Sequence, residues 1–139
     1  MAGDVLIAMY GANIGQCSIV GIESTTNQAV CACTPYEGVN NRFLLLTLRA
    51  KARYFMGLGA GGAQPNISQK IIRDLKIPLP PLSEQRRIAS ILDQADVLRQ
   101  KRQQAIEKLD QLLQATFIDM FGDPVSNPKG FEVKKLSEQ

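Results

Sequence analysis

The chain has 139 residues, of which 45% are hydrophobic, and a formal net charge of +3 at neutral pH. It can build one modest core with one extension, and no stretch reaches the roughly 18 apolar residues that a membrane-spanning helix needs. It contains no histidine and three cysteines, Cys17, Cys31 and Cys33, without a C-x-x-C pair. A structural zinc site would therefore lack ligands, and histidine acid–base catalysis is unavailable. We expect reduced, cytoplasmic thiols that pack as small apolar groups.

Three segments near the start have the length and composition of short β-strands: residues 4–10, 16–22 and 27–34. The first two are joined by the glycine-punctuated turn 11–15. Their succession along the chain predicts a meander.

Helical spacing begins after the strands. Apolar residues recur at intervals of three and four over 39–56, with Asn40 or Asn41 as the N-cap and Gly57 as the stop. The glycine-rich stretch 57–62 lacks the Gly-Lys-Ser/Thr of a P-loop, which leaves a loop or linker as its interpretation. Ser68 is placed to cap a short helix through Leu75, and residues 76–77 are predicted as a strand.

Prolines 78, 80 and 81 then impose an extended chain. Ser83 is predicted as the N-cap of a helix that carries Glu84 in its first turn and ends at Gly122. Residues 84–121 would span about 57 Å, so this helix needs a partner along its length. A lone helix lying on its own domain is the alternative interpretation.

The apolar residues of this helix follow alternating steps of three and four, which is typical of a coiled-coil seam. Arg102 interrupts the seam, and near the end the pattern drifts by one residue. Acids and bases balance along the helix, which favours packing and spacing over phosphate binding. The predicted pairing residues are Ile88, Ile91, Ala95, Leu98, Leu109, Leu112 and Leu113.

The segment IPLPPLSEQRRIASILD, followed by a long helix ending in ATFIDMFGDP, resembles the conserved region of specificity subunits of type I restriction–modification systems. The upstream GGAQPNISQKIIRDLKIPLPPL extends the resemblance, and PKGFEVKKLSE resembles the opening of a second target-recognition domain. The resemblance covers nearly the whole chain. It implies an α+β fold, with a small mixed α/β target-recognition head followed by one long coiled-coil helix.

The resemblance also implies three parts. Residues 1–78 would be the C-terminal part of a recognition domain, 79–121 the proline knot and spacer helix, and 122–139 a tail or the start of a second recognition domain. Such subunits are non-catalytic. They direct a methyltransferase subunit and a restriction (motor) subunit to a bipartite site on double-stranded DNA. S-adenosylmethionine, ATP and magnesium belong to those subunits, and no cofactor is expected here.

Candidate DNA contacts come from side-chain chemistry. Residues 42–76 carry seven basic residues against one acid, and a phosphate backbone requires such a surface. Phosphate contacts are predicted for Arg49, Lys51 and Arg53. Base-edge contacts are predicted for Asn13, Gln64 and Asn66, although local turn hydrogen bonding explains the last two equally well.

In the family the spacer helix pairs antiparallel with a second conserved helix, which this sequence lacks. We therefore expect two copies to pair as a homodimer. Two rival hypotheses remain. One is a coiled-coil interaction module without a DNA role. The other is a small nuclease that uses Asp123, Glu132 and Lys134 as a metal-binding triad.

Overall fold

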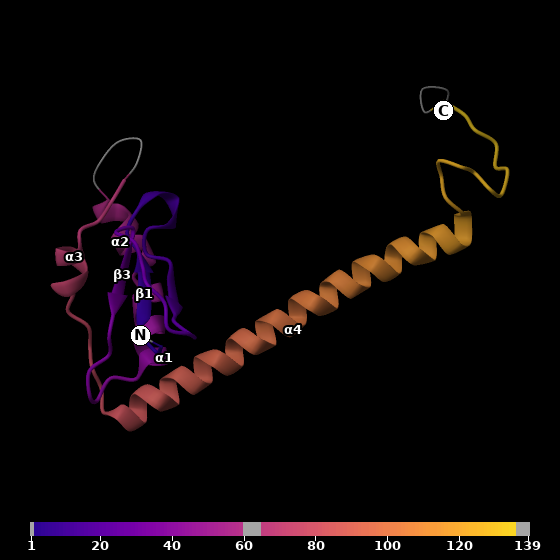
Figure 1. The fold of residues 1–139 in the computed structure, drawn as a ribbon. Helices are drawn as coiled ribbons and strands as arrows, with labels where there is room; N and C mark the ends of the chain where they lie inside the picture. Colours follow the sequence, from indigo (N-terminus) through magenta and orange to yellow (C-terminus); the bar gives the residue numbers. More distant parts are fainter. Residues whose placement is uncertain (1, 60–64, 136–139) are drawn as a thin grey trace. The chain divides into compact units, whose positions relative to one another are not determined.

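The computed structural model describes residues 2–59 and 65–135. The chain divides into two compact units, Met1–Asp93 and Gln94–Gln139. The first contains the sheet, three helices and the first three turns of a long helix (Figure 1). The second contains the remainder of that helix and a turn-rich segment after it. The predicted α+β class is confirmed.

A three-stranded antiparallel sheet forms the centre of the first unit. It consists of β1 (Val5–Ala8), β2 (Cys17–Ile19) and β3 (Val30–Cys33), in the order β2-β1-β3. The predicted meander is therefore wrong, because β3 pairs with β1. The segment between β2 and β3 is long enough to return the chain to the other edge of β1. β1 is therefore the central strand, and this position suits it because its Val5 and Ile7 are fully buried.

Two helices form in this part of the chain instead of the single one predicted over 39–56. Helix α1 (Asn41–Ala50) is capped by Asn40, whose side chain accepts from the Phe43 N–H at 2.9 Å, as predicted. Lys51 interrupts the helix, and α2 (Ala52–Leu58) follows. A Cβ at Gly15 would lie 2.9 Å from the Ala52 Cα atom. The 11–15 turn therefore packs closely against the start of α2, a contact that local periodicity does not reveal.

The chain then returns to the sheet before the short helix α3 (Gln69–Arg73). The Ile67 N–H donates to the Met9 carbonyl at 3.0 Å, so this segment extends the edge beyond β1. Ser68 occupies the N-cap position, but its side chain makes no capping hydrogen bond. Residues 76–77 form no strand. The core combines strand, helix and loop residues; its largest fully buried apolar members are Phe55, Ile7, Leu45, Ile67 and Val5.

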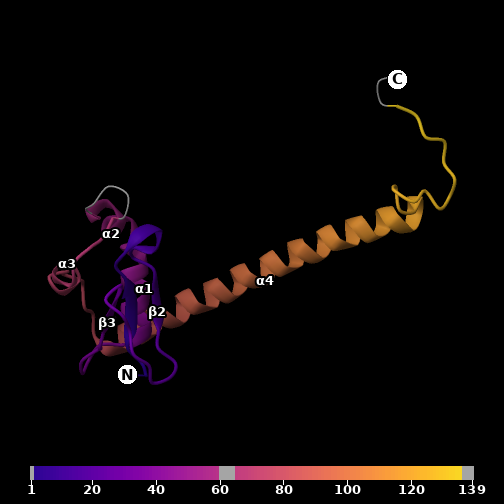
Figure 2. The same ribbon diagram turned by 45° about the horizontal axis from the view of Figure 1, so that its top comes forward.

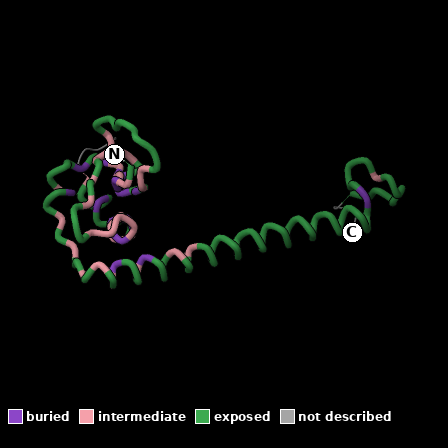
Figure 3. The backbone as a smooth tube through the Cα atoms, turned by 60° about the horizontal axis from the view of Figure 1, so that its bottom comes forward, coloured by how far each residue is buried: buried purple, intermediate pink, exposed green. Residues whose placement is uncertain are grey.

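The long helix α4 (Leu82–Phe121) has 40 residues. It begins two residues before the prediction, because the Pro81 carbonyl already accepts from the N–H groups of Glu84 and Gln85 at 2.9 and 3.0 Å. Ser83 is therefore inside the helix and is not its N-cap. Glu84 lies in the first turn as expected. Figure 3 shows the change in environment along α4, from buried and half-buried positions in its first turns to exposed ones beyond them.

The predicted stop at Gly122 is confirmed. Gly122 has φ +80°, and its N–H donates to the Ile118 carbonyl at 2.7 Å. The Lys129 ammonium donates to the carbonyls of Asp119 and Met120 at 2.9 and 2.6 Å. A cation at the negative end of the helix dipole satisfies carbonyls that otherwise lack partners.

Candidate nucleic-acid interface and pairing helix

Two of the three predicted base-edge residues, Asn13 and Asn66, lie at one end of the first unit. Asn13 closes the 3-10 helix η1 (Gly11–Asn13) and is exposed. Asn66 is also exposed and forms an isolated bridge with Tyr10, and the Gly11 N–H donates to the Pro65 carbonyl at 2.8 Å. The structure thus brings together two turns from distant parts of the sequence. Gln64 lies outside the described residues.

Helix α2 ends at the same end of this unit. Gly59 lies against the side chains of Pro65 and Ile14, as the position of a hypothetical Gly59 Cβ indicates. Figures 1 and 2 both show α2 at the end of the first unit away from the first turn of α4. Arg53 is exposed on α2. The exposed amides of Asn13 and Asn66 lie at this end, and α2 also carries an exposed arginine; such groups bind base edges and phosphates.

Arg49 and Arg53 are four residues apart and would share a face of one continuous helix, but the helix breaks at Lys51 between them. Arg49 donates to the Cys17 carbonyl of β2 through Nε at 3.3 Å and Nη2 at 3.0 Å. It therefore ties α1 to an edge strand. The Lys51 ammonium lies 5.8 Å from the centre of the Tyr54 ring, within cation–π range.

Two of the seven basic residues in 42–76 pair with nearby acids, so the excess of positive charge is smaller than the sequence indicates. Arg42 pairs with Asp93 at 2.5 Å, and Lys70 pairs with Asp74 on α3. These two cations are compensated locally. The remaining basic residues of 42–76 lie on different elements: Arg49, Lys51, Arg53, Arg73 and Lys76.

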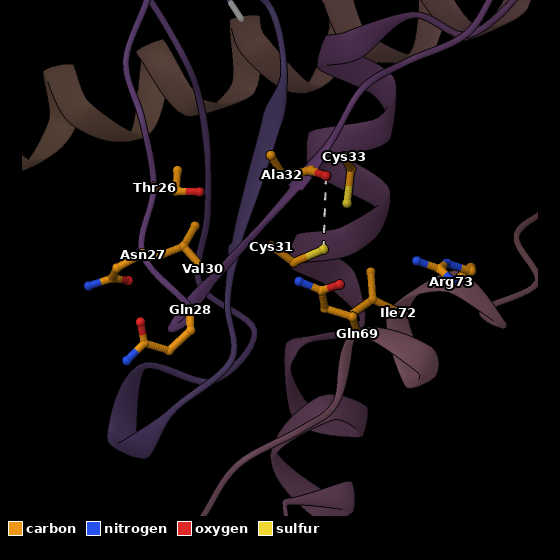
Figure 4. A pocket seen from close by; sticks show the side chains of 10 residues that line it. All are labelled: Thr26, Asn27, Gln28, Val30, Cys31, Ala32, Cys33, Gln69, Ile72 and Arg73. Carbon is orange, nitrogen blue, oxygen red and sulfur yellow. Dashed lines mark hydrogen bonds between the residues drawn. The ribbon is translucent and has the colours of Figure 1, made fainter.

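A pocket of about 610 Å³ lies between β3 and α3. Figure 4 shows the thiols of Cys31 and Cys33 on the same side of β3, with Gln69 and Arg73 contributed by α3. Burial, and secondarily the neighbouring Cys31, raises the pKa of Cys33 to about 12; burial likewise raises the pKa of Cys17 to about 11. All three cysteines are free. A protonated thiol is a poor nucleophile, so the raised pKa disfavours Cys33 as a nucleophile in this pocket.

The residues of the nuclease hypothesis are engaged elsewhere. The Asp123 carboxylate accepts from the N–H groups of Val125 and Ser126 and from the Ser126 hydroxyl, at 2.8 to 3.3 Å. These hydrogen bonds lower the pKa of Asp123 and make it the anchor of a turn. Glu132 pairs with Lys134 at 3.1 Å. Across residues 2–59 and 65–135, no cluster of three His, Cys, Asp or Glu side chains could hold a metal ion.

The predicted pairing residues of α4 are largely uncovered. Ile91, Leu98, Leu109, Leu112 and Leu113 are 51 to 71% exposed. Ile88 is only half-buried and lines a groove of about 490 Å³ against α1 and Pro80. Toward the end of the helix, the rings of Phe117 and Phe121 lie 5.0 Å apart. An apolar stripe of this length is unfavourable in water without a covering surface.

Comparison with known proteins identifies the family. A family model described as "Type I restriction modification DNA specificity domain" matches residues 2–108, which include the whole first unit and much of α4. The chain belongs to this family.

Specificity subunits are also the relatives found by sequence. The chain is 28% identical over 144 residues to the type I restriction enzyme MjaIX specificity subunit of Methanocaldococcus jannaschii, covering 91% of this chain and 33% of the relative. The MjaVIII specificity subunit of the same organism is 29% identical over 137 residues, covering 97% and 32%. The EcoR124I/EcoR124II specificity subunit of Escherichia coli is 28% identical over 83 residues, covering 58% and 20%.

The structural comparison agrees with the sequence. A chain from a solved structure, described as "Structural basis underlying complex assembly and conformational transition of the type I R-M system", matches with a TM-score of 0.65 and 28% identity. The match covers 81% of this chain and 29% of that chain. The chain spans about a third of the length of the MjaIX and MjaVIII specificity subunits. Among the described residues, no helix is both long and apolar enough to cross a membrane.

Sequence reasoning missed one feature of the site. Gln85, within the quoted Ser-Glu-Gln segment, is fully buried and binds three backbone groups. The only signal was a glutamine beside apolar positions in the first turn of a helix, and this pattern is too common to identify a buried contact.

Proposed function

We propose that this chain is the DNA-recognition part of a type I restriction–modification complex and directs methyltransferase and restriction subunits to a bipartite site on double-stranded DNA. The observation that carries the proposal is the continuous match of one specificity-domain model across both the recognition head and the helix that follows it. The exposed amides of Asn13 and Asn66 and the exposed guanidinium of Arg53 supply groups suited to base edges and phosphates.

The proposed role is non-catalytic. The chain has no histidine, its buried thiols have raised pKa values, and the Asp123 carboxylate holds a turn. The chemistry would belong to the partner subunits, which would use S-adenosylmethionine, ATP and Mg²⁺. The proposed compartment is the cytoplasm, where those subunits and reduced thiols would occur.

Co-elution tests this role. The chain and the methyltransferase subunit encoded beside it are expected to leave a size-exclusion column as one mixed complex, with a mass by light scattering that fits both. Separate elution of a folded chain would favour a coiled-coil module without a DNA role, the second candidate, which the uncovered seam of α4 also supports.

We further propose that two copies pair through α4, in antiparallel orientation. A parallel pair would place the two Arg102 side chains directly against each other at one seam level, which is unfavourable for like charges. An antiparallel pair avoids this contact, and one register pairs every position in the series of three- and four-residue steps from Ile88 to Leu112. Its layers are Ile88 with Leu112, Ile91 with Leu109, Ala95 with Ala105, and Leu98 with Arg102. Large residues thus meet large ones, and small residues meet small ones.

Mixed-disulfide formation tests orientation and register together. Two variants, Leu98→Cys and Arg102→Cys, are oxidised alone and after mixing. Antiparallel pairing in this register predicts a cross-link chiefly in the mixture, whereas parallel pairing predicts one within each variant alone. Unaltered protein, with its three free cysteines, is the control. A monomer at tens of micromolar would contradict pairing of either kind.

A further inference from the structure

The contact between α4 and the rest of the first unit has a buried polar centre. Gln85 has no exposed surface. Its side-chain oxygen accepts from the Asn40 N–H at 2.9 Å, and its amide nitrogen donates to the carbonyls of Gly38 and Pro80 at 2.9 and 2.8 Å. Both of its N–H groups and one acceptor position are therefore used by backbone atoms of other segments.

Two further contacts continue along the same face of α4. Ala89, one turn after Gln85, is 5% exposed, so the helix lies close to its neighbours there. One turn later, the Asp93 carboxylate accepts from Nε of Arg42 on α1 at 2.6 Å. Residues four apart share a helix face, so Gln85, Ala89 and Asp93 form one stripe across three turns. We call this stripe the joint.

The joint is hydrogen-bonded to the start of α1. The Asn40 N–H binds Gln85, while the Asn40 side chain caps α1 through the Phe43 N–H. Arg42, in the first turn of α1, binds Asp93. The beginning of α4 is therefore attached at two points to the beginning of α1, whose other end carries Arg49.

A polar contact of this kind is directional. An apolar contact tolerates sliding and rotation of a helix, whereas rotation at Gln85 would break three hydrogen bonds and leave its buried side-chain amide unpaired. We propose that Gln85 is a positioning residue: together with the Arg42–Asp93 pair, it holds the first turns of α4 in one rotational setting on the recognition head and thereby restricts the spacing between half-sites that the complex accepts. This inference rests on the proposed function.

DNA geometry explains why spacing is sensitive to such a joint. One added base pair moves a half-site by about 3.4 Å and rotates it by about 35° around the duplex. Two recognition heads that are held in a fixed orientation can contact both half-sites at one spacer length, but not when the spacer is one base pair longer or shorter. Heads that can turn on their helices would accept several.

The first arm of the test needs no DNA. Gln85→Met keeps the side-chain size and removes the hydrogen bonds, and Gln104→Met, at an exposed position of the same helix, is the matched control. Residual dipolar couplings are measured for the strands and for residues 82–93. One alignment tensor is expected to fit both sets in the unaltered chain and in Gln104→Met. In Gln85→Met, the couplings of residues 82–93 should shrink while those of the strands stay unchanged.

The second arm measures spacing. Randomised DNA is selected with the full chain and its methyltransferase subunit, and the half-site sequence and the spacer lengths are read from the selected pool. One spacer should be enriched about tenfold or more over neighbours that differ by one base pair, and Gln85→Met should reduce this to within about twofold. The half-site sequence should not change, which separates loss of positioning from loss of folding.

The outcomes are distinguishable. Absence of any selected sequence with the unaltered chain would refute the proposed function. The joint as a positioning element would be overturned by separate tensors for the unaltered chain, or by one unchanged spacer for Gln85→Met. If Gln85→Met does not fold, Asp93→Asn replaces it. It disrupts a half-exposed ion pair, and we expect a smaller broadening of the spacer distribution in the same direction.

Discussion

At the residue scale, Arg49 and Arg53 have different surroundings despite their spacing of four. The Arg49 guanidinium donates a hydrogen bond to the Cys17 carbonyl, while Arg53 is exposed on α2. A hydrogen bond from a charged donor to a backbone carbonyl contributes about 1.5 to 3 kcal/mol when partly buried. Arg49 is thus expected to stabilise the fold in addition to any phosphate contact.

Salt dependence of DNA binding separates the two arginines. Arg53→Gln should reduce the slope of log affinity against log salt by about one without changing the melting temperature, and the double change with Arg49→Gln should reduce it by about two. Arg49→Gln should also lower the melting temperature. Arg87→Gln, which breaks an exposed pair with Glu84 near the start of α4, is the control and should leave the slope unchanged. An unchanged slope in the double variant would exclude both as phosphate contacts.

The buried thiols predict how stability depends on pH. Folding raises the pKa of Cys17 to about 11 and that of Cys33 to about 12, from an ordinary value of 9.0. The folded state binds these protons more tightly, so this contribution to stability is complete below pH 9 and is lost as pH rises toward 11 to 12. Denaturant titrations from pH 8 to 11 should show the decline. Cys17→Ala and Cys33→Ala together should flatten it, and an equal decline in that variant would contradict the assignment.

At the scale of the element, one charged side chain in the apolar seam of α4 is expected to weaken the pairing of two copies. In the proposed register, Arg102 faces Leu98 of the second copy and interrupts an otherwise apolar seam. Arg102→Leu should therefore tighten the dimer about tenfold or more, since burying a leucine contributes about 1.5 to 3 kcal/mol. Sedimentation at several concentrations gives the dissociation constant. Gln104→Leu, outside the seam, is the control; equal affinity in both variants would contradict the register.

Elements defined by local chemistry could be predicted from the sequence. The Asn40 cap and the glycine stop at Gly122 depend on a few adjacent residues, and both occur where expected. The break at Lys51 and the pairing of β3 with β1 could not be predicted, because they depend on contacts between distant segments. Ser83 was assigned as a cap because sequence alone does not show that the Pro81 carbonyl begins the helix earlier.

At the scale of the whole molecule, the division into a recognition head and a spacer helix rests on the family resemblance and stays a prediction, because one family model spans both parts. The candidate site was less predictable. Asn13 and Asn66 approach each other only because the segment at Pro65–Ile67 returns to the end of β1. The role of Gln85 could not be predicted because two of its three partners, Asn40 and Gly38, lie 45 and 47 residues away in the sequence.

Two-fold pairing has a consequence for the DNA. A symmetric dimer presents two identical recognition surfaces related by a two-fold axis, so its site should be an inverted repeat of one half-site around a fixed spacer. One chain with two different recognition domains would instead read two different half-sites.

Mapping adenine methylation in cells that express this chain with its methyltransferase subunit tests the central claim most directly. We predict methylation at one split, inverted-repeat sequence with a single spacer length, lost when the chain is omitted. Methylation that is absent in the presence of the chain, independent of it, or confined to an undivided sequence would contradict the account.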